Sequence, residues 1–113
     1  MDLTILTQMN DLELIDAQLG DTYWQPVDVA HINDWVLRMA AFKGEYHWHL
    51  HDDDEMFIVY KGSIVIDTEK GPVFLKAGQV AVIPKGLRHK PKADERAVIL
   101  MIEPARLISK GTV

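Results

Sequence analysis

The feature that most constrains the fold is a series of short apolar runs separated by glycine and proline turns. After Pro26, seven runs rich in apolar and β-branched residues follow one another, and several alternate apolar with polar positions. Such alternation is typical of strands with one buried face, and short strands at this spacing predict an all-β sandwich or barrel. The expected strands are residues 27–32, 34–42, 56–60, 63–68, 72–75, 79–84 and 97–102.

One short helix is expected before the first strand. Residues 10–19 carry apolar side chains at i, i+4 spacing, Asn10 or Asp11 can cap the amino-terminal end, and Gly20 can end the helix. We expect this helix to be peripheral. Large apolar residues elsewhere are interpreted as core, namely Trp35, Met39, Phe57, Ile64 and Val82.

Length and composition limit the class of protein. A chain of 113 residues with 48% hydrophobic and 26% charged residues predicts a single domain over 1–113 with a core of its own. The absence of cysteine excludes disulfides, thiolate nucleophiles and cysteine zinc sites. The net charge of −5 disfavours nucleic acid as a partner. No signal-peptide pattern begins the sequence and no apolar run approaches the roughly 20 residues of a membrane span, so we expect no membrane partner and a cytoplasmic location.

Histidines cluster just before the third expected strand. His47, His49 and His51 occupy alternate positions, so in an extended segment the three imidazoles share one face. Glu55 precedes the next apolar run, and His89 follows 38 residues after His51. Imidazole and carboxylate together suit Fe, Mn, Ni, Zn or Cu, which predicts a site for one divalent transition metal. The alternative is a solvated loop, rich in histidine and acid, that binds metal adventitiously.

Two stretches resemble the sequence motifs of the cupin superfamily. The first is Gly44-x4-His49-x-His51-x3-Glu55-x6-Gly62, and the second is Gly78-x5-Pro84-x-Gly86-x2-His89. Residues 63–77 separate them, a spacing that resembles compact, mainly prokaryotic cupins. The resemblance implies a jelly-roll barrel, or double-stranded β-helix, with a metal inside it. The residues that match the family's metal ligands are His49, His51, Glu55 and His89.

The sequence departs from the family pattern at two positions. Gly44 lies one residue closer to the histidine pair than usual, and Ala93 stands where the family usually has asparagine. Neither position is a metal ligand in the family. Flanking phrases such as Ile102-Glu103-Pro104 resemble a subgroup of small single-domain cupins often labelled mannose-6-phosphate isomerase-like. That label rests on fold similarity and does not imply the chemistry.

Other polar residues near the motifs have two interpretations each. His47 is the candidate catalytic residue, as an acid/base or substrate contact, and the alternative is a hydrogen-bonded interior histidine without a catalytic role. The acids at 52–54 could compete with Glu55 for the metal, but a solvated loop is the simpler account. The basic residues within 85–92 could attract an anionic substrate, but alternation around His89 favours a solvated outer surface.

Two classes of function stay open at this point. One is a metal-dependent enzyme that acts on a small organic acid or sugar-like molecule, and the alternative is a non-catalytic module that binds a small molecule or a metal. Trp24, Trp48 and Leu50, with other apolar residues, exceed what one small barrel is expected to cover, so we also expect a homodimer. Small cupins that this chain resembles are often dimers, which points the same way.

Overall fold

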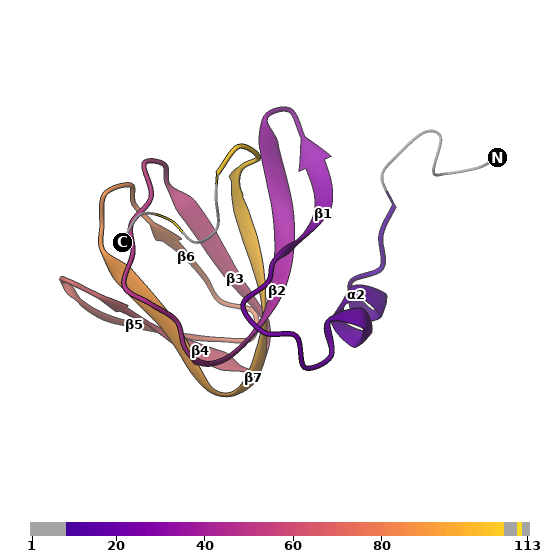
Figure 1. Ribbon diagram of the computed structural model, residues 1–113, viewed down its shortest axis with the longest axis horizontal. Helices are drawn as coiled ribbons and strands as arrows, with labels where there is room; N and C mark the ends of the chain where they lie inside the picture. The colour runs from indigo at the N-terminus through magenta and orange to yellow at the C-terminus, as the bar shows by residue number, and fades with distance from the viewer. Residues whose placement is uncertain (1–8, 108–110, 112–113) are drawn as a thin grey trace.

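The computed structural model describes residues 9–107 and 111 of the chain. In this part, one helix, α2 (Leu12–Leu19), precedes seven strands (Figure 1). The strands are β1 (Val27–Ile32), β2 (Trp35–Glu45), β3 (Glu55–Lys61), β4 (Ser63–Thr68), β5 (Gly71–Lys76), β6 (Val80–Ile83) and β7 (His89–Pro104). The mostly β fold with one short amino-terminal helix confirms the prediction. No helix of the described residues is long and apolar enough to cross a bilayer.

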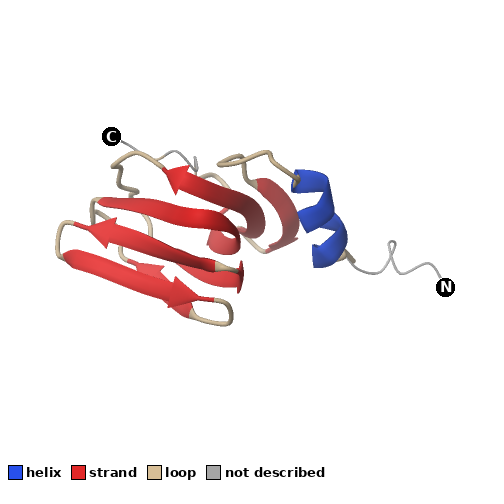
Figure 2. Ribbon diagram, turned by 90° about the horizontal axis from the view of Figure 1, so that it is seen from below, coloured by secondary structure: helices blue, strands red, loops and turns tan. Residues whose placement is uncertain are grey.

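Strand β7 organises the fold because it pairs with three other strands. Along one edge it runs antiparallel to β2, from Glu45 opposite Lys92 to Trp35 opposite Pro104. Along its other edge, its first residues pair with β4 and its later residues pair with β3. The strand therefore belongs to both sides of the barrel. One side has the order β1-β2-β7-β3-β6, and the β4–β5 hairpin extends the other (Figure 1, Figure 2).

A tight glycine turn brings β3 and β4 against β7. Gly62 connects the two strands with a φ of +81°, a conformation that favours glycine. A Cβ at this position would lie 3.1 Å from the Cα of Ala97 and 3.1 Å from the carbonyl oxygen of Arg96. Because the neighbouring atoms are largely backbone, they cannot move aside easily. Both the conformation and the space therefore require glycine here.

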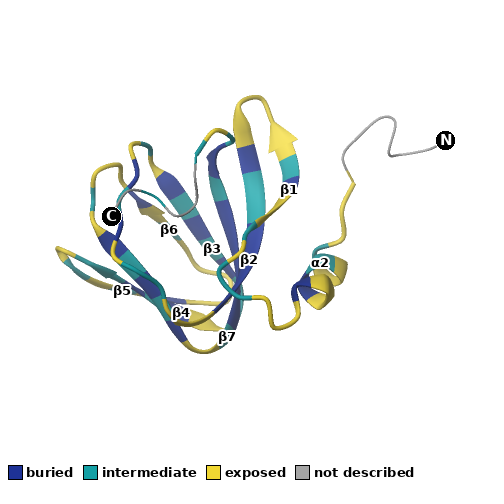
Figure 3. Ribbon diagram, in the orientation of Figure 1, coloured by how far each residue is buried: buried dark blue, intermediate teal, exposed yellow. Residues whose placement is uncertain are grey.

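The core has two layers, one inside the barrel and one between the sheet and α2. Strands β2 and β7 contribute to both layers, so they are buried on both faces over much of their length (Figure 3). This explains why residues 39–42 of β2 and 97–102 of β7 are continuous apolar runs instead of alternating ones. The inner layer includes Phe42, Phe57, Val59, Ile64, Ile66 and Ile99. The outer layer includes Leu19, Met39, Ala41, Val98 and Leu100.

Helix α2 is attached to the barrel by one buried carboxylate. The helix begins after Asp11, whose side chain accepts hydrogen bonds from the next backbone amides, and ends at Gly20 as predicted. Asp16 is 7% exposed and forms ion pairs with Lys61 (2.7 Å) and Arg96 (2.6 Å). These two cations lie on β3 and β7, so the contacts fix the helix across the outer layer.

The start predicted for the last strand is wrong by eight residues. It was expected at residue 97, but β7 begins at His89. The residues in between are charged and include Pro91, so they lack the usual strand pattern. Their alternation is nevertheless regular, since His89, Pro91 and Ala93 are buried while Lys90 and Lys92 are only partly buried. Pairing with β2 and β4 outweighs the weak local preference.

Two of the five predicted core residues are wrong. Trp35 is 43% exposed and Val82 is 51% exposed, whereas Met39, Phe57 and Ile64 are buried as predicted. Trp35 begins its strand, and Val82 lies on β6, which ends the described strand order. Large apolar residues at a sheet margin have no layer packed over them, and sequence patterns do not reveal which strands lie there.

Candidate metal centre

The four predicted ligands lie together inside the barrel. His49 and His51 lie on the segment between β2 and β3, Glu55 begins β3 and His89 begins β7. Two backbone hydrogen bonds between His49 and His89, with N···O distances of 3.0 and 2.9 Å, join the two segments. All four residues are at most 5% exposed. Residues from two distant parts of the sequence are thus brought to one buried place.

The histidine-rich segment lies between two strands, as the predicted strand boundaries place it. Residues 46–54 lie outside the named strands, and His49 forms only an isolated bridge. The alternation of side chains nevertheless holds, because His49 and His51 are buried while Trp48 is 38% exposed. Pairing with the start of β7 is enough to keep these positions extended without a full ladder.

Backbone carbonyls fix the tautomers of two imidazoles. Nδ1 of His49 lies 2.9 Å from the carbonyl oxygen of His47, and Nδ1 of His89 lies 2.8 Å from that of Leu87. A carbonyl only accepts, so Nδ1 carries the proton in both rings and donates it. Nε2 is then the unprotonated nitrogen, which is the form of imidazole that binds a metal.

The free ring nitrogens converge. His49, His51 and His89 each offer a nitrogen, and the three nitrogens lie within 4.8 Å of one another. Oε1 of Glu55 lies 3.6 Å from Nε2 of His51 and 3.8 Å from Nε2 of His89, although Glu55 is outside the compact three-histidine group. These three atoms are buried without a hydrogen-bond partner in the described part of the chain. Such atoms are rare and costly, and one shared cation would satisfy them all.

Burial keeps the imidazoles neutral. Desolvation lowers the pKa of His49 to about 4, and it lowers the pKa of His51 and His89 from their ordinary value. Desolvation also raises the pKa of Glu55. Neutral imidazoles are metal ligands without first losing a proton, and a cation beside Glu55 would favour its carboxylate form.

A second buried carboxyl, which the sequence analysis did not assign to the site, lies beside Glu55. Glu103 is 0% exposed, and burial followed by its interaction with Glu55 raises the pKa of Glu103 to about 8. Its Oε2 is a further buried atom without a hydrogen-bond partner in the described part of the chain. Nη1 of Arg38 lies 2.6 Å from the other oxygen, Oε1 of Glu103. The sequence contains one indication of this role, because Glu103 lies two residues after Met101 in an apolar run and so shares its inward-facing side.

His47 lies at the margin of the histidine group. It is partly exposed, and its ring lies 4.0 Å from the ring of Tyr46 and 5.2 Å from that of His49 between centroids. It is not one of the three histidines whose nitrogens converge. The structure thus brings His47 close to the predicted ligands without making it one of them.

The neighbouring charges belong to the surface. Asp53 pairs with Arg106 at 2.7 Å and 3.0 Å, and Asp54 accepts a hydrogen bond from a backbone amide, so both are engaged away from the metal centre. In the predicted basic cluster, Lys90 pairs with Glu45 at 2.9 Å and Lys92 pairs with an acid on β4. The solvated-loop and outer-surface interpretations fit these contacts.

A small cavity adjoins His49 and Glu55. Its volume is about 30 Å³, which is room for one or two water molecules. The ring of Trp24 stacks on Phe42 at 4.2 Å and on Tyr46 at 4.9 Å, and the Tyr46 ring meets His49 edge-on at 5.4 Å. The remaining walls are Phe57, Met101, Pro26 and Pro91.

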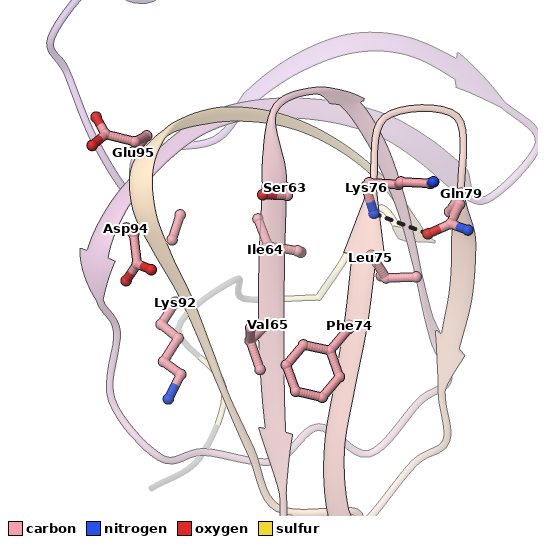
Figure 4. A pocket seen from close by; sticks show the side chains of 11 residues that line it. Ser63, Ile64, Val65, Phe74, Leu75, Lys76, Gln79, Lys92, Asp94 and Glu95 are labelled. Carbon is pink, nitrogen blue, oxygen red and sulfur yellow. Dashed lines mark hydrogen bonds between the residues drawn. The ribbon is translucent and has the colours of Figure 1, made fainter.

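A larger hollow of about 650 Å³ lies over β4, β5 and the first half of β7 (Figure 4). Its lining includes the exposed ring of Phe74, and the backbone amide of Lys76 donates to the side chain of Gln79 at 3.0 Å. None of the four predicted ligands lines it. Size alone therefore does not mark the functional site.

Comparisons with known proteins agree with this architecture. The chain is 43% identical over 77 residues to the uncharacterized protein YdbB of Bacillus subtilis strain 168, covering 66% of this chain and 68% of that protein. It is 37% identical to a cupin-2 domain protein of Shewanella frigidimarina, whose crystal structure superimposes with a TM-score of 0.79 over 86% of this chain and 95% of that one. Over 68 residues, or 57% of this chain, it is 37% identical to acireductone dioxygenase of Sulfurihydrogenibium sp. strain YO3AOP1. The match covers 36% of that dioxygenase.

A jelly-roll barrel with a buried three-histidine cluster defines the class of protein. The sequence model of the cupin domain matches residues 36–103, which include all four predicted ligands. The chain belongs to the cupin family, as a small cupin. Its assignment to the subgroup labelled mannose-6-phosphate isomerase-like stays a prediction.

Proposed function

We propose that His49, His51, His89 and Glu55 bind one divalent transition metal, and that the protein is a metal-dependent enzyme acting on a small molecule. One observation carries this proposal, namely three neutral imidazoles and a carboxylate converging in a buried place with unpartnered atoms. A bound ion would supply open coordination positions and Lewis acidity. The donor set suits Fe, Mn, Ni, Zn or Cu, and metal supply decides between them.

Chemistry that uses dioxygen is the first reaction class to test. The similarity to a protein named acireductone dioxygenase supports this choice, since the match is 37% identical. Histidine and carboxylate ligands with open positions are also the donor set of non-haem iron oxygenases. Oxygen uptake in the presence of a substrate would support this class, whereas turnover without oxygen uptake would favour an isomerase or hydrolase.

His47 is our candidate for the proton carrier. Its ring is partly exposed and lies 5.2 Å from that of His49, so it can exchange protons with solvent near the site. We expect His47→Gln to keep the metal content and to lower the turnover number by about 100-fold. An unchanged turnover number would leave His47 with a structural role only.

Metal analysis tests the site itself. We expect about one equivalent of transition metal in tag-free protein purified without chelator, and loss of this metal in His49→Ala and Glu55→Ala. His31→Ala is the matched control, because His31 is exposed on β1 and should leave the metal content unchanged. Absence of metal after reconstitution with each candidate ion, or unchanged content in both ligand variants, would refute the proposal.

The alternative is a non-catalytic binding module. The small volume beside the histidines, about 30 Å³, favours it, because typical substrate pockets are about ten times larger. A binding module predicts that a ligand raises the melting temperature without being converted. Product formation with any stabilising ligand would exclude this alternative.

We also propose that the protein forms a homodimer in the cytoplasm. The sequence analysis based this dimer partly on Trp24, but the Trp24 ring stacks on Phe42 beside the cavity and does not form part of an exposed patch. Other apolar residues support the dimer instead. Val80 and Val82 are each 51% exposed on β6, next to partly exposed Met56 and Ile58 of β3. Light scattering at micromolar concentration checks the state, and a monomer would refute the proposal.

A further inference from the structure

The cavity beside the metal centre has an unusual chemical lining. Apart from His49 and Glu55, its walls are rings, prolines and a thioether, and their polar side-chain groups are the hydroxyl of Tyr46 and the indole N–H of Trp24, which already donates to the carbonyl oxygen of Lys43. No lysine, arginine, amide or aliphatic hydroxyl lines it. A carboxylate or a sugar placed here would lose water without gaining hydrogen-bond partners, which is costly. The lining therefore favours a different ligand from the acid or sugar suggested by the sequence.

We propose that this cavity binds a small, neutral, planar ring carrying one oxygen, of which phenol is the simplest, and that Trp24 and Tyr46 form a wall that moves to admit it. The inference rests on the proposed function, because the oxygen is taken to face the metal centre. Aromatic rings favour such a ligand because offset stacking and edge-to-face contacts add to the burial of apolar area.

The size of the cavity requires that a wall moves. A volume of about 30 Å³ holds one or two water molecules, which is too little for a six-membered ring. Phe42, Phe57 and Met101 are at most 4% exposed and lie within β2, β3 and β7, where neighbouring strands hold them. Trp24 and Tyr46 are partly exposed and lie outside the named strands. They are therefore the two rings of the wall that strand pairing does not hold in place.

The backbone of Trp24 gives independent support. Its φ is +62°, a left-handed conformation that a bulky residue rarely adopts. It is held there by hydrogen bonds from its backbone amide to Ala41 and from its indole Nε1 to the carbonyl of Lys43, both 2.9 Å. Strained residues of this kind cluster at active sites, ligand clamps and switch regions.

Fluorescence of a single tryptophan tests the movement and the ligand class together. In a Trp35→Phe, Trp48→Phe variant reconstituted with zinc, Trp24 is the one remaining tryptophan. We expect phenol to change its emission in a saturable way, with an affinity about tenfold higher than that of cyclohexanol, which has similar size but no planar ring. Gluconate should bind more weakly than phenol. Equal or tighter binding of cyclohexanol or gluconate, or no change in emission, would overturn the inference.

Substitutions of Trp24 and Tyr46 test whether these two rings cause the preference for phenol over cyclohexanol. We expect Trp24→Leu to reduce the preference for phenol over cyclohexanol to about twofold or less, measured by calorimetry. Trp35→Leu is the matched control and should keep the full preference, because Trp35 does not line the cavity. If Trp24→Leu does not fold, Tyr46→Leu replaces it as the test variant, because it removes another partly exposed ring of the same wall. The same loss of preference for phenol is expected. An unchanged preference in a folded wall variant would overturn the inference.

The metal content of each sample separates the two proposals. If zinc binds at one equivalent but phenol is not preferred, the ligand class is wrong and the proposed metal function stands. If no metal binds to the wild-type protein, the proposed function fails, and the inferred orientation of the ligand fails with it.

Discussion

The contact between Arg38 and Glu103 makes a stringent prediction about stability. The Arg38 side chain is 11% exposed and the Glu103 side chain is 0% exposed, with 2.6 Å between Nη1 and Oε1. Arg38 also donates to the carbonyl oxygens of Leu107 (2.9 Å) and Ala105 (3.0 Å) and pairs with Asp28 at 2.9 Å. This one cation thus joins β1, β2 and the residues after β7 to the carboxyl beside the metal centre.

The perturbation is Arg38→Met in metal-free protein at pH 9, above the raised pKa of Glu103 (about 8), where this carboxyl is ionised. Removing one partner of a buried ion pair leaves the other charge uncompensated, and we expect a loss of about 3–5 kcal/mol in the free energy of unfolding. In a Glu103→Gln background no buried carboxylate is left behind, so the same change should cost about 2 kcal/mol less, the remainder being the lost carbonyl hydrogen bonds. The two costs together define a coupling energy of about 2 kcal/mol.

Urea unfolding followed by circular dichroism, with chelator present, measures all four proteins of this double-mutant cycle. The carbonyl contacts of Arg38 are lost in both backgrounds, so they cancel in the coupling energy. A coupling below about 0.5 kcal/mol would show that the Arg38–Glu103 contact does not stabilise the fold in the way argued from its burial.

Three further predictions follow from particular residues. Zinc at a concentration 100 times its dissociation constant should stabilise the protein by about 2.7 kcal/mol, and His89→Ala should abolish this shift in thermal melts; an undiminished shift would place the metal elsewhere. Gly62→Ala should cost about 2 kcal/mol or more in urea, because strain at a φ of +81° adds to contacts at 3.1 Å, whereas Gly86→Ala, with no atom within 4 Å, should cost about half as much; equal costs would refute the steric argument. The pKa of Glu103 is raised from its ordinary value of 4.5 to about 8 in the folded chain. Between these two values the folded chain binds a proton that the unfolded chain has lost, so raising the pH lowers stability. The free energy of unfolding of the metal-free protein should therefore fall by up to about 2 kcal/mol between pH 6.5 and 8. Glu103→Gln should flatten this slope, and a slope unchanged in that variant would show that another group titrates.

Below pH 6.5 a different group acts in the opposite direction. The pKa of His49 is lowered to about 4, so the unfolded chain binds more protons than the folded chain between pH 6.5 and 4. Its contribution to stability is therefore lost as the pH falls through this range. For that reason the test of Glu103 belongs above pH 6.5.

Much of the fold and of the candidate site was predictable because both depend on local pattern. Two expected strands, 27–32 and 63–68, agree with β1 and β4 at both ends, since glycine, proline and asparagine mark where strands stop. Alternate spacing placed His49 and His51 on one side of the chain even without a regular strand. The resemblance to the two cupin motifs assigned Glu55 and His89 to the same site.

The remaining features depend on which distant segments meet, and a single sequence does not encode this in any local pattern. Glu103 and Arg38 become important only because β7 places one beside Glu55 and β2 places the other against it. Trp24 lines the cavity because a loop before β1 folds back on Phe42. The sequence by itself determined which side chains could face inward, because strand periodicity is local. Only the tertiary structure decided which of them share the metal centre and which close its cavity, because burial and contact arise from strand pairing across the whole chain.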